Sequence, residues 1–285
     1  MFIQSLDEFK IDFEAYQPEE EDREGIRCLL KQLFLRENVD ILELIEHLIG
    51  EKDLCLIVKQ LHEEDEEDGE KDNEEQPKEE EEDLDVYSIT ALLNLNDQKV
   101  NSKPFVPKLL KVFQRQAHEC GQQQAIDQVF KNKESKLAFW INERFINLPL
   151  RLGLTSLENV LMESDKKKQV FTHHVILSKL LKPKLEQKKK KGKRQKIGQA
   201  SSSSGIENPD SPTLIYLNGE DELFAQNAEF GYEYKVGNEL VDSSVNANWS
   251  TGQNFLPYRK VLILKDDKFR KVLKTLKSEL ANQSV

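Results

Sequence analysis

Apolar residues recur along this chain at two spacings, which predict strands and helices. Near the beginning, Phe9, Ile11 and Phe13 alternate with charged or polar neighbours, the pattern of a half-buried strand. Further runs of alternating or continuous apolar residues, many of them β-branched or aromatic, predict more strands. We therefore expect strands at 9–15, 54–61, 86–95, 137–141, 170–181, 213–217, 229–236 and 258–264.

Other apolar residues recur every three or four positions, which predicts helices with one buried face. Asp40 and Glu43 form a capping box before one such helix. Gly50 is suited to the left-handed cap at the end of that helix. Helices are predicted from about 19 to 34, at 40–50, 107–120 and 122–130, from 155 onward, and at 220–227 and 266–281.

This order of elements predicts the fold class. We count seven or eight strands and five or six helices, and the strands often follow one another directly. A strictly alternating parallel sheet does not fit that order, whereas a mixed α/β (α+β) fold does. We expect one domain over residues 1–285, with a mixed, largely antiparallel sheet flanked by helices.

The least ambiguous stretch is 137–149, which predicts a buried strand, a polar corner and then a helix. Leu137 to Ile141 is a continuous apolar run, and Glu143 and Arg144 place opposite charges just past its expected end. Pro149 closes the stretch because proline cannot donate to a sheet. A capping-box pattern at 155–158 predicts that the next helix opens there.

Glu143 is the best candidate in this chain for acid–base catalysis, since sites often lie at strand ends. Arg144 beside it offers a simpler use. Either side chain can satisfy loose backbone groups at the corner before Pro149. We favour this structural interpretation over the catalytic one.

Charge is segregated into two segments. Residues 63–83 hold 15 acids and 2 bases, a net charge of −13, while the whole chain carries −11, so the remainder sums to +2. Such a run cannot bury enough apolar surface to offset its ordering entropy, and we expect a disordered acidic loop. Its carboxylates can cover a basic client; association with the chain's own basic segment is the alternative. The residues most concentrated in charge are Glu63, Glu64, Asp65, Glu66, Glu67, Asp68, Glu79, Glu80, Glu81, Glu82 and Asp83.

The second segment, 182–212, is basic and then serine-rich, and we expect another disordered loop. Residues 182–196 hold 9 bases and 1 acid, a net charge of +8. Such a cluster is typical of nuclear import signals, and the alternative is a solvated loop with weak, salt-sensitive affinity for polyanions. The import-like cluster is Lys188, Lys189, Lys190, Lys191, Lys193 and Arg194.

Several familiar motifs are absent from the sequence. There is no glycine-rich phosphate loop, no C-x-x-C or H-x-x-x-H pair and no G-x-S-x-G elbow. His173 and His174 are neighbours on a predicted strand and point to opposite faces, so a shared metal is disfavoured. Cys28, Cys55 and Cys120 suit free thiols in a reducing compartment, the first two as core residues. We find neither a signal peptide nor an apolar run near the ~20 residues of a membrane helix.

The stretch Glu-Arg-Phe-Ile-Asn-Leu-Pro at 143–149 resembles the signature of the BCCIP family of nuclear proteins. The resemblance implies that its members are structural or form a partner surface; they are Glu143, Arg144, Phe145, Asn147 and Pro149. In chain order, the other matching pieces are 11–16, 25–34, 58–60, 92–95, 249–250 and the closing strand and helix. Two differences are Leu150, where the family usually has a second proline, and the lack of a long acidic tail before the first strand.

The resemblance implies a non-enzymatic nuclear protein with a fold similar to acetyltransferases related to histone acetylases. Those enzymes hold acetyl-CoA with a glycine-rich loop at a helix N-terminus. No such loop occurs in this chain, so we expect the fold without a cofactor. The resemblance also implies nuclear export, escort of a large-subunit ribosomal protein and ribosome assembly. In animal members it implies recombinational repair and cell-cycle control through a kinase inhibitor.

We therefore expect a nuclear protein that acts as a chaperone for a basic ribosomal client and contacts the import and export machinery. Shuttling to the cytoplasm is left open. One alternative is an adaptor in DNA repair and cell-cycle regulation, bound to a recombination mediator or a cyclin-dependent kinase inhibitor. Another is a degenerate acyltransferase, which binding of acetyl-CoA would reveal. No membrane contact is expected, and nucleic-acid contact through the basic segment is left open.

Overall fold

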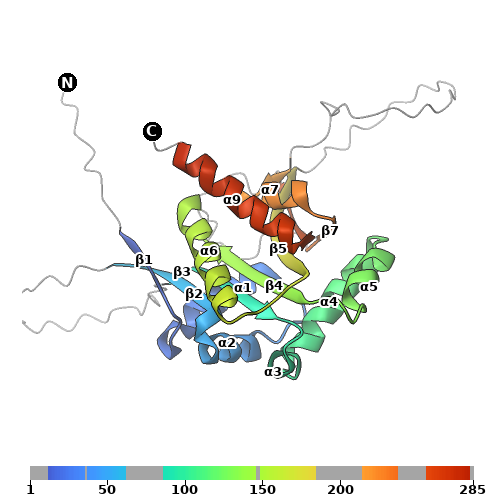
Figure 1. Ribbon diagram of the computed structural model, residues 1–285, viewed down its shortest axis with the longest axis horizontal. Coiled ribbons are helices and arrows are strands. Elements are labelled where there is room, and N and C mark those ends of the chain that lie inside the picture. Colours follow the sequence, from blue (N-terminus) through green and yellow to red (C-terminus); the bar gives the residue numbers. More distant parts are fainter. Residues whose placement is uncertain are drawn as a thin grey trace, which may run out of the picture.

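The computed structural model describes residues 12–35, 37–61, 86–145, 148–183, 214–236 and 255–282. Its centre is one open sheet with the strand order β1-β2-β3-β4-β5-β8-β7, and β6 pairs with β5 off this path (Figure 1). The strands are β1 (Phe13–Tyr16), β2 (Cys55–Gln60), β3 (Val86–Asn94), β4 (Leu137–Arg144), β5 (His173–Pro183), β6 (Ile215–Tyr216), β7 (Phe230–Lys235) and β8 (Phe255–Lys265).

All strand pairs are antiparallel except β4 with β5, which confirms the predicted mixed, largely antiparallel sheet. The parallel pair follows from the connection, because a helix crosses between the two strands. Their register runs only from Leu137 opposite His173 to Trp140 opposite Ile176. Beyond Trp140 the two strands are no longer paired with each other, which leaves a gap in the sheet.

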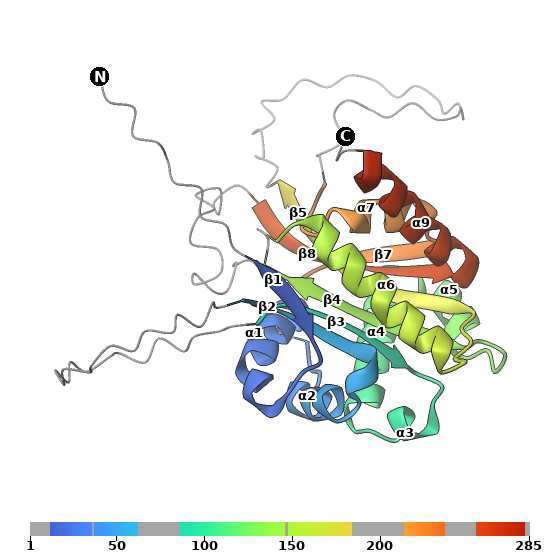
Figure 2. The ribbon, with the colours of Figure 1, turned by 60° about the vertical axis from the view of Figure 1, so that its left-hand side comes forward.

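Helices cover both faces of the sheet (Figures 1 and 2). One core joins the sheet to the helices at the beginning and middle of the chain, and the other joins it to the later helices. The first group is α1 (Arg23–Phe34), α2 (Ile41–Gly50), α3 (Gln98–Asn101), α4 (Phe105–Glu119) and α5 (Gln123–Phe130); the second is α6 (Leu150–Lys166), α7 (Glu220–Asn227) and α9 (Asp266–Asn282).

The central strand β4 is buried along its whole length. Phe139 and Ile141 belong to the first core, while Ala138 and Trp140 belong to the second. A strand covered on both faces needs apolar residues at successive positions. This explains the continuous apolar run that made the strand easy to predict.

Three local predictions are wrong, and one short helix was missed. Glu143 and Arg144 lie inside β4, which is longer than its apolar run, and not past its end. Helix α6 begins at Leu150, five residues before the capping-box pattern, with Pro149 as its cap. Gly50 is the last residue of α2 and has no left-handed backbone. The short helix α3 was not expected, although Asp97 caps it by accepting from Lys99 N at 2.8 Å.

Among the described helices, none combines the length and the apolar character that crossing a bilayer requires. The acidic residues Glu63 to Asp83 and the basic cluster Lys188 to Arg194 lie outside the described residues, and so does most of 182–212. The described structure therefore gives the places where these segments join the fold.

Candidate functional site

One end of the sheet collects the features that the sequence singled out; we call it the motif end. It is the end at which β4 finishes at Arg144. Strand pairing places Leu61 after β2, Val86 at the start of β3 and Pro183 at the end of β5 at this same end (Figure 2). Leu61 and Val86 flank the acidic segment in the sequence, and Pro183 precedes the basic cluster. Both charged segments therefore join the fold at the end that carries the motif.

An aromatic row lies at the motif end. The rings of Phe13 and Tyr87 meet edge to face with centroids 5.4 Å apart, and those of Tyr87 and Phe145 do so at 5.7 Å. Tyr87 also donates its hydroxyl to Gln60 Oε1 at 3.3 Å. All three rings are only half buried. Because its ring is only half buried, Phe145 of the motif contributes to an apolar surface that a partner can reach. The edge-to-face contacts hold the rings of this row in a preferred geometry.

Arg144 of the motif is buried and acts inside the fold. Its guanidinium donates through Nη1 and Nη2 to the two carboxylate oxygens of Glu220, at 2.5 and 2.6 Å. Asn142 Nδ2 donates to the same carboxylate at 2.7 Å. A two-pronged contact of this kind fixes orientation as well as distance. The motif arginine therefore anchors the first turn of α7 to β4.

Helix α6 makes room for this arginine. A Cβ on Gly153 would lie 2.5 Å from Arg144 Nη1 and 3.5 Å from Glu220 Oε1. That separation from Nη1 is shorter than any normal contact, so a Cβ there would force the guanidinium away from the position in which Glu220 holds it. Leu150, where the family usually has a second proline, is the first residue of α6. Proline is favoured at that position but not required, which explains why leucine is accommodated.

Glu143 is fully buried and forms an ion pair with Lys179 of β5. Its second oxygen, Oε2, has no hydrogen-bond partner among the described residues, and neither has Asp221 Oδ1. The other oxygen of Asp221 accepts from Ser178 Oγ at 2.6 Å. A catalytic base must reach its substrate, and a side chain with no exposed surface does not. The contacts of Glu143 thus fit a structural role, although its partner is Lys179 rather than a corner of the backbone.

On the face of the sheet that α7 covers, the buried charges balance if one acid holds a proton. Two carboxyls (Glu220 and Asp221) meet one cation (Arg144) there, while Glu143 lies on the other face, where Arg259 is also buried. Burial, followed by the charge of Glu220, raises the pKa of the Asp221 carboxyl from 3.8 to about 8. A protonated Asp221 leaves one negative and one positive charge on the α7 face, which suits a buried group.

The segment that leads into α7 fills the gap between β4 and β5. Leu217 N donates to Lys179 O at 3.1 Å, and Asn218 Nδ2 donates to Asn142 O at 2.9 Å. In open α/β sheets, ligands commonly bind past the carboxyl ends of parallel strands at such a divergence. Here the segment leading into α7 occupies that place.

The two adjacent histidines point to different faces, as predicted. His174 is buried, stacked on Phe269 at 4.2 Å, and accepts from Trp140 Nε1 through Nδ1 at 2.8 Å. Its Nε2 therefore carries the hydrogen given to Asp266 Oδ1 at 2.8 Å. Burial lowers the pKa of His174. His173 is half buried and lies 3.4 Å from Glu229. No group of three or more metal-ligating side chains occurs in the part of the chain that the structure describes.

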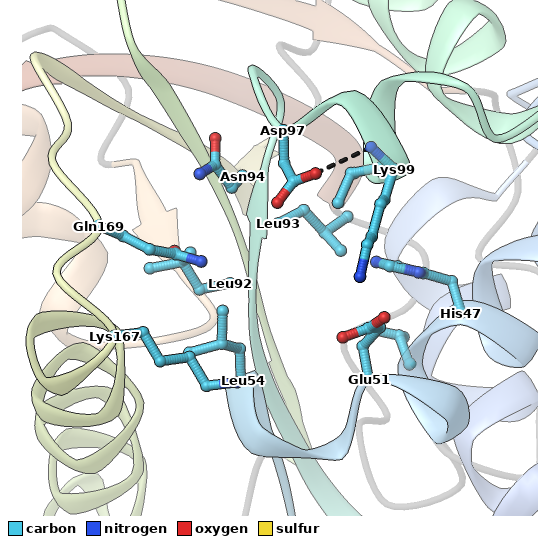
Figure 3. Close-up of a pocket in the computed structure, with 12 residues that line it drawn as sticks. His47, Glu51, Leu54, Leu92, Leu93, Asn94, Asp97, Lys99, Lys167 and Gln169 are labelled. Carbon is cyan, nitrogen blue, oxygen red and sulfur yellow. Dashed lines mark hydrogen bonds between the residues drawn. The ribbon is translucent and has the colours of Figure 1, made fainter.

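A small pocket lies at the opposite end of the sheet from the motif (Figure 3). Its volume is about 150 Å³, and its charged lining residues are Glu51, Asp97, Lys99 and Lys167. These charges cancel, so the pocket has no net preference for an anion or a cation. Lys167 is already bound to Asp53 at 2.5 Å. We assign this pocket no part in the candidate site.

Sequence reasoning found only part of the site. Of the predicted motif residues, Phe145 lies in the aromatic row, Arg144 and Glu143 lie in the buried cluster, and exposed Pro149 caps α6. Asn147 lies outside the described residues. Reasoning from the sequence missed Glu220, Lys179 and Gly153. Acids in a first helical turn are ordinary, so Glu220 gave no signal of its burial.

The fold defines the class, a mixed α/β protein with a single open sheet. Residues 8–224 match the family model BCCIP. A "Protein BCCIP homolog" of Xenopus tropicalis is 30% identical over 281 residues, covering 95% of this chain and 83% of the relative. The "Protein BCCIP homolog" of Drosophila melanogaster is 27% identical over 271 residues, covering 94% and 83%. The chain therefore belongs to the BCCIP family, as its motifs predicted.

Two further comparisons concern partners and fold. The "BRCA2 and CDKN1A-interacting protein" of Mus musculus is 24% identical over 282 residues, covering 96% of this chain and 82% of the relative. The crystal structure of BCP1 from Saccharomyces cerevisiae superimposes with a TM-score of 0.59 at 14% identity, covering 94% of this chain and 88% of that one. The second likeness supports the fold.

Proposed function

We propose that this protein is a nuclear chaperone that shields and escorts a basic client, a ribosomal protein of the large subunit, and supports its transport. The observation that carries the proposal is the attachment of the acidic segment, at Leu61 and Val86, beside the aromatic row at the motif end. A client on that row meets the −13 charge of residues 63–83. Long-range attraction raises the encounter rate, and apolar contact gives specificity.

Deletion of residues 63–83 tests this function. Binding of a purified large-subunit ribosomal protein should weaken at least tenfold at low salt (roughly 1.4 kcal/mol), and its salt dependence should flatten, because the attraction is screened. The measurement is titration calorimetry at several salt concentrations. A chain in which 63–83 is replaced by a neutral Gly/Ser segment of the same length controls for loop length. Unchanged affinity at low salt would contradict the proposal.

A second candidate function is that of a repair or cell-cycle adaptor. It is favoured by the name of the mouse relative, which describes that protein as interacting with BRCA2 and CDKN1A. Affinity purification from nuclear extract at moderate salt, read by mass spectrometry, separates the two. Ribosomal proteins and assembly factors that are lost on deletion favour the chaperone. Repair or cell-cycle proteins that bind regardless of the deletion favour the adaptor.

A further inference from the structure

Strand β1 forms one edge of the described sheet and pairs only with β2 in it. Leu61 N donates to Asp12 O at 2.8 Å, and this bond shows which residues of β1 have their backbone groups turned toward β2. In an antiparallel pair, alternate residues bond to the partner strand. Asp12, Glu14 and Tyr16 therefore bond to β2, while Phe13 and Ala15 turn their N–H and C=O groups outward. The outer edge of β1 can thus accept another strand.

One face of this edge is acidic. Residues 12–22 contain six acids and no base. A groove of about 590 Å³ runs beside the strand, with Tyr16, Glu19 and Glu21 in its lining. Lys59 also lines it but is bound to Asp22 at 2.5 Å and to Glu21 at 3.2 Å. Glu19 is paired with Lys52 at 3.5 Å, so three acids (Glu19, Glu21 and Asp22) meet two lysines. The groove therefore keeps one net negative charge that a basic side chain would complement.

The other face of the edge is apolar. Side chains alternate along a strand, so Phe13 lies on the face opposite Glu14 and Tyr16. Phe13 is the end of the aromatic row that continues through Tyr87 to Phe145. A strand added to β1 would place its own alternate side chains over these two different surfaces.

We propose that the edge of β1 docks an extended segment of a basic protein in which basic and apolar residues alternate. The basic residues lie over Glu14 and the groove, and the apolar ones lie beside Phe13. Main-chain hydrogen bonds to Phe13 and Ala15 complete the added strand. A second copy of this chain is a poor occupant, because it would bring Glu14 against more acids. The proposal rests on the chaperone function and names the surface that the client uses.

The test uses the full chain and fluorescently labelled decapeptides. One peptide alternates lysine and valine; a second has the same residues in two blocks; a third alternates glutamate and valine. We expect the alternating basic peptide to bind most tightly. Hydrogen exchange read by NMR should show slower exchange at the Phe13 and Ala15 amides, while the Glu14 and Tyr16 amides, already bonded to β2, change little.

Two variants separate backbone pairing from charge. Ala15→Pro removes an outward N–H without breaking a bond to β2, and proline is tolerated on edge strands. We expect peptide binding to weaken roughly fivefold to tenfold. Glu14→Lys should weaken it to a similar extent at low salt, whereas Glu134→Lys, the same change on an exposed residue at the other end of the sheet, should not. Thermal melting confirms that each variant is folded.

Equal binding of the alternating and block peptides, or indifference to Ala15→Pro, would overturn the proposal. So would a wild-type dimer that Ala15→Pro converts to a monomer, since the occupant would then be a second copy. The chaperone function is judged separately. A ribosomal client that depends on residues 63–83 but ignores Ala15→Pro leaves that function standing and rejects this docking site. The opposite result is a ribosomal client that never binds, while the alternating peptide still slows amide exchange in β1. That result rejects the chaperone function and leaves the docking site standing.

Discussion

At the scale of single residues, the motif at 143–149 contributes side chains both to the interior and to the surface. Arg144 and Glu143 are buried and hold β4 to α7 and β5 through ion pairs with Glu220 and Lys179. Phe145, next in sequence, is half buried and reaches the aromatic row. Neighbours on a strand face opposite ways, so a short motif can serve both purposes. Removing either partner of a buried ion pair leaves an uncompensated charge, which is far more damaging than replacing both.

The proton on Asp221 leads to a prediction about pH. The pKa of this carboxyl is raised to about 8 in the fold, so its contribution to stability is complete below the ordinary value of 3.8 and disappears as the pH rises to about 8. Asp221→Asn keeps the acceptor for Ser178 and cannot ionise. Relative to wild type, this variant should therefore gain stability with rising pH, by at most about 1.4 kcal/mol per pH unit. Urea unfolding across that pH range measures the difference. A constant difference would show that Asp221 is ionised in the fold.

At the scale of elements, the buried cluster explains how helices on one face are held at fixed positions. Arg144 of β4 clamps α7, and Gly153 lets α6 approach the same guanidinium. The opposite face has buried charges of its own, because Glu143 pairs with Lys179 there and Arg259 donates through Nε to the Leu33 carbonyl of α1 at 2.7 Å. Positions within either face therefore differ in the substitutions that they tolerate. Apolar packing accepts exchange of similar volumes, whereas a buried ionic contact does not.

Two glycines inside helices should respond in opposite ways to alanine. Alanine normally stabilises a helix by about 0.5 to 1 kcal/mol relative to glycine. Gly50→Ala should gain stability, because nothing lies within 4 Å of its new Cβ. Gly153→Ala should lose roughly 1 to 3 kcal/mol, because its Cβ would displace Arg144. Denaturant unfolding of the two variants checks both signs. Stabilisation by both would mean that α6 shifts freely away from β4.

At the scale of the whole molecule, the two ends of the sheet carry different features. The ends of β2 and β5, the start of β3 and the motif all lie at one end. The small pocket and the short connections lie at the other. The segments of net charge −13 and +8 thus join the fold at the same end of the sheet. The acidic segment can attract a basic client or the basic segment itself, so the proposed function depends on where the acidic segment joins the fold.

The effect of the acidic segment's position on client binding can be tested by moving the segment. Residues 63–83 can be deleted and reinserted between Asn132 and Lys133, an exposed connection at the end away from the motif. Net charge is then unchanged, but the acidic segment no longer joins the fold beside the aromatic row. We expect client binding at moderate salt to stay about as weak as in the deletion, because screening limits the attraction to about 10 Å. Full restoration would show that net charge alone matters.

The sequence by itself determined most elements, the class of the sheet and the family. Apolar periodicity depends on local spacing, and it located the described strands and nearly all of the helices. The acidic and basic segments were visible as counts of charge. Element boundaries failed where side chains far apart in sequence decided them. Glu143 and Arg144 extend β4 because Lys179 and Glu220 neutralise them there.

Only the tertiary structure decided where these pieces meet. No periodic pattern predicts that Glu220 lies under Arg144, that Gly153 yields space to it, or that Phe13, Tyr87 and Phe145 form one row. Apart from the approach of Gly153 to Arg144, these contacts join residues more than 50 positions apart. The sheet order that creates them is set by packing of the whole chain. The physical reason is that local spacing determines which face of an element is buried, while pairing between elements determines what that face touches.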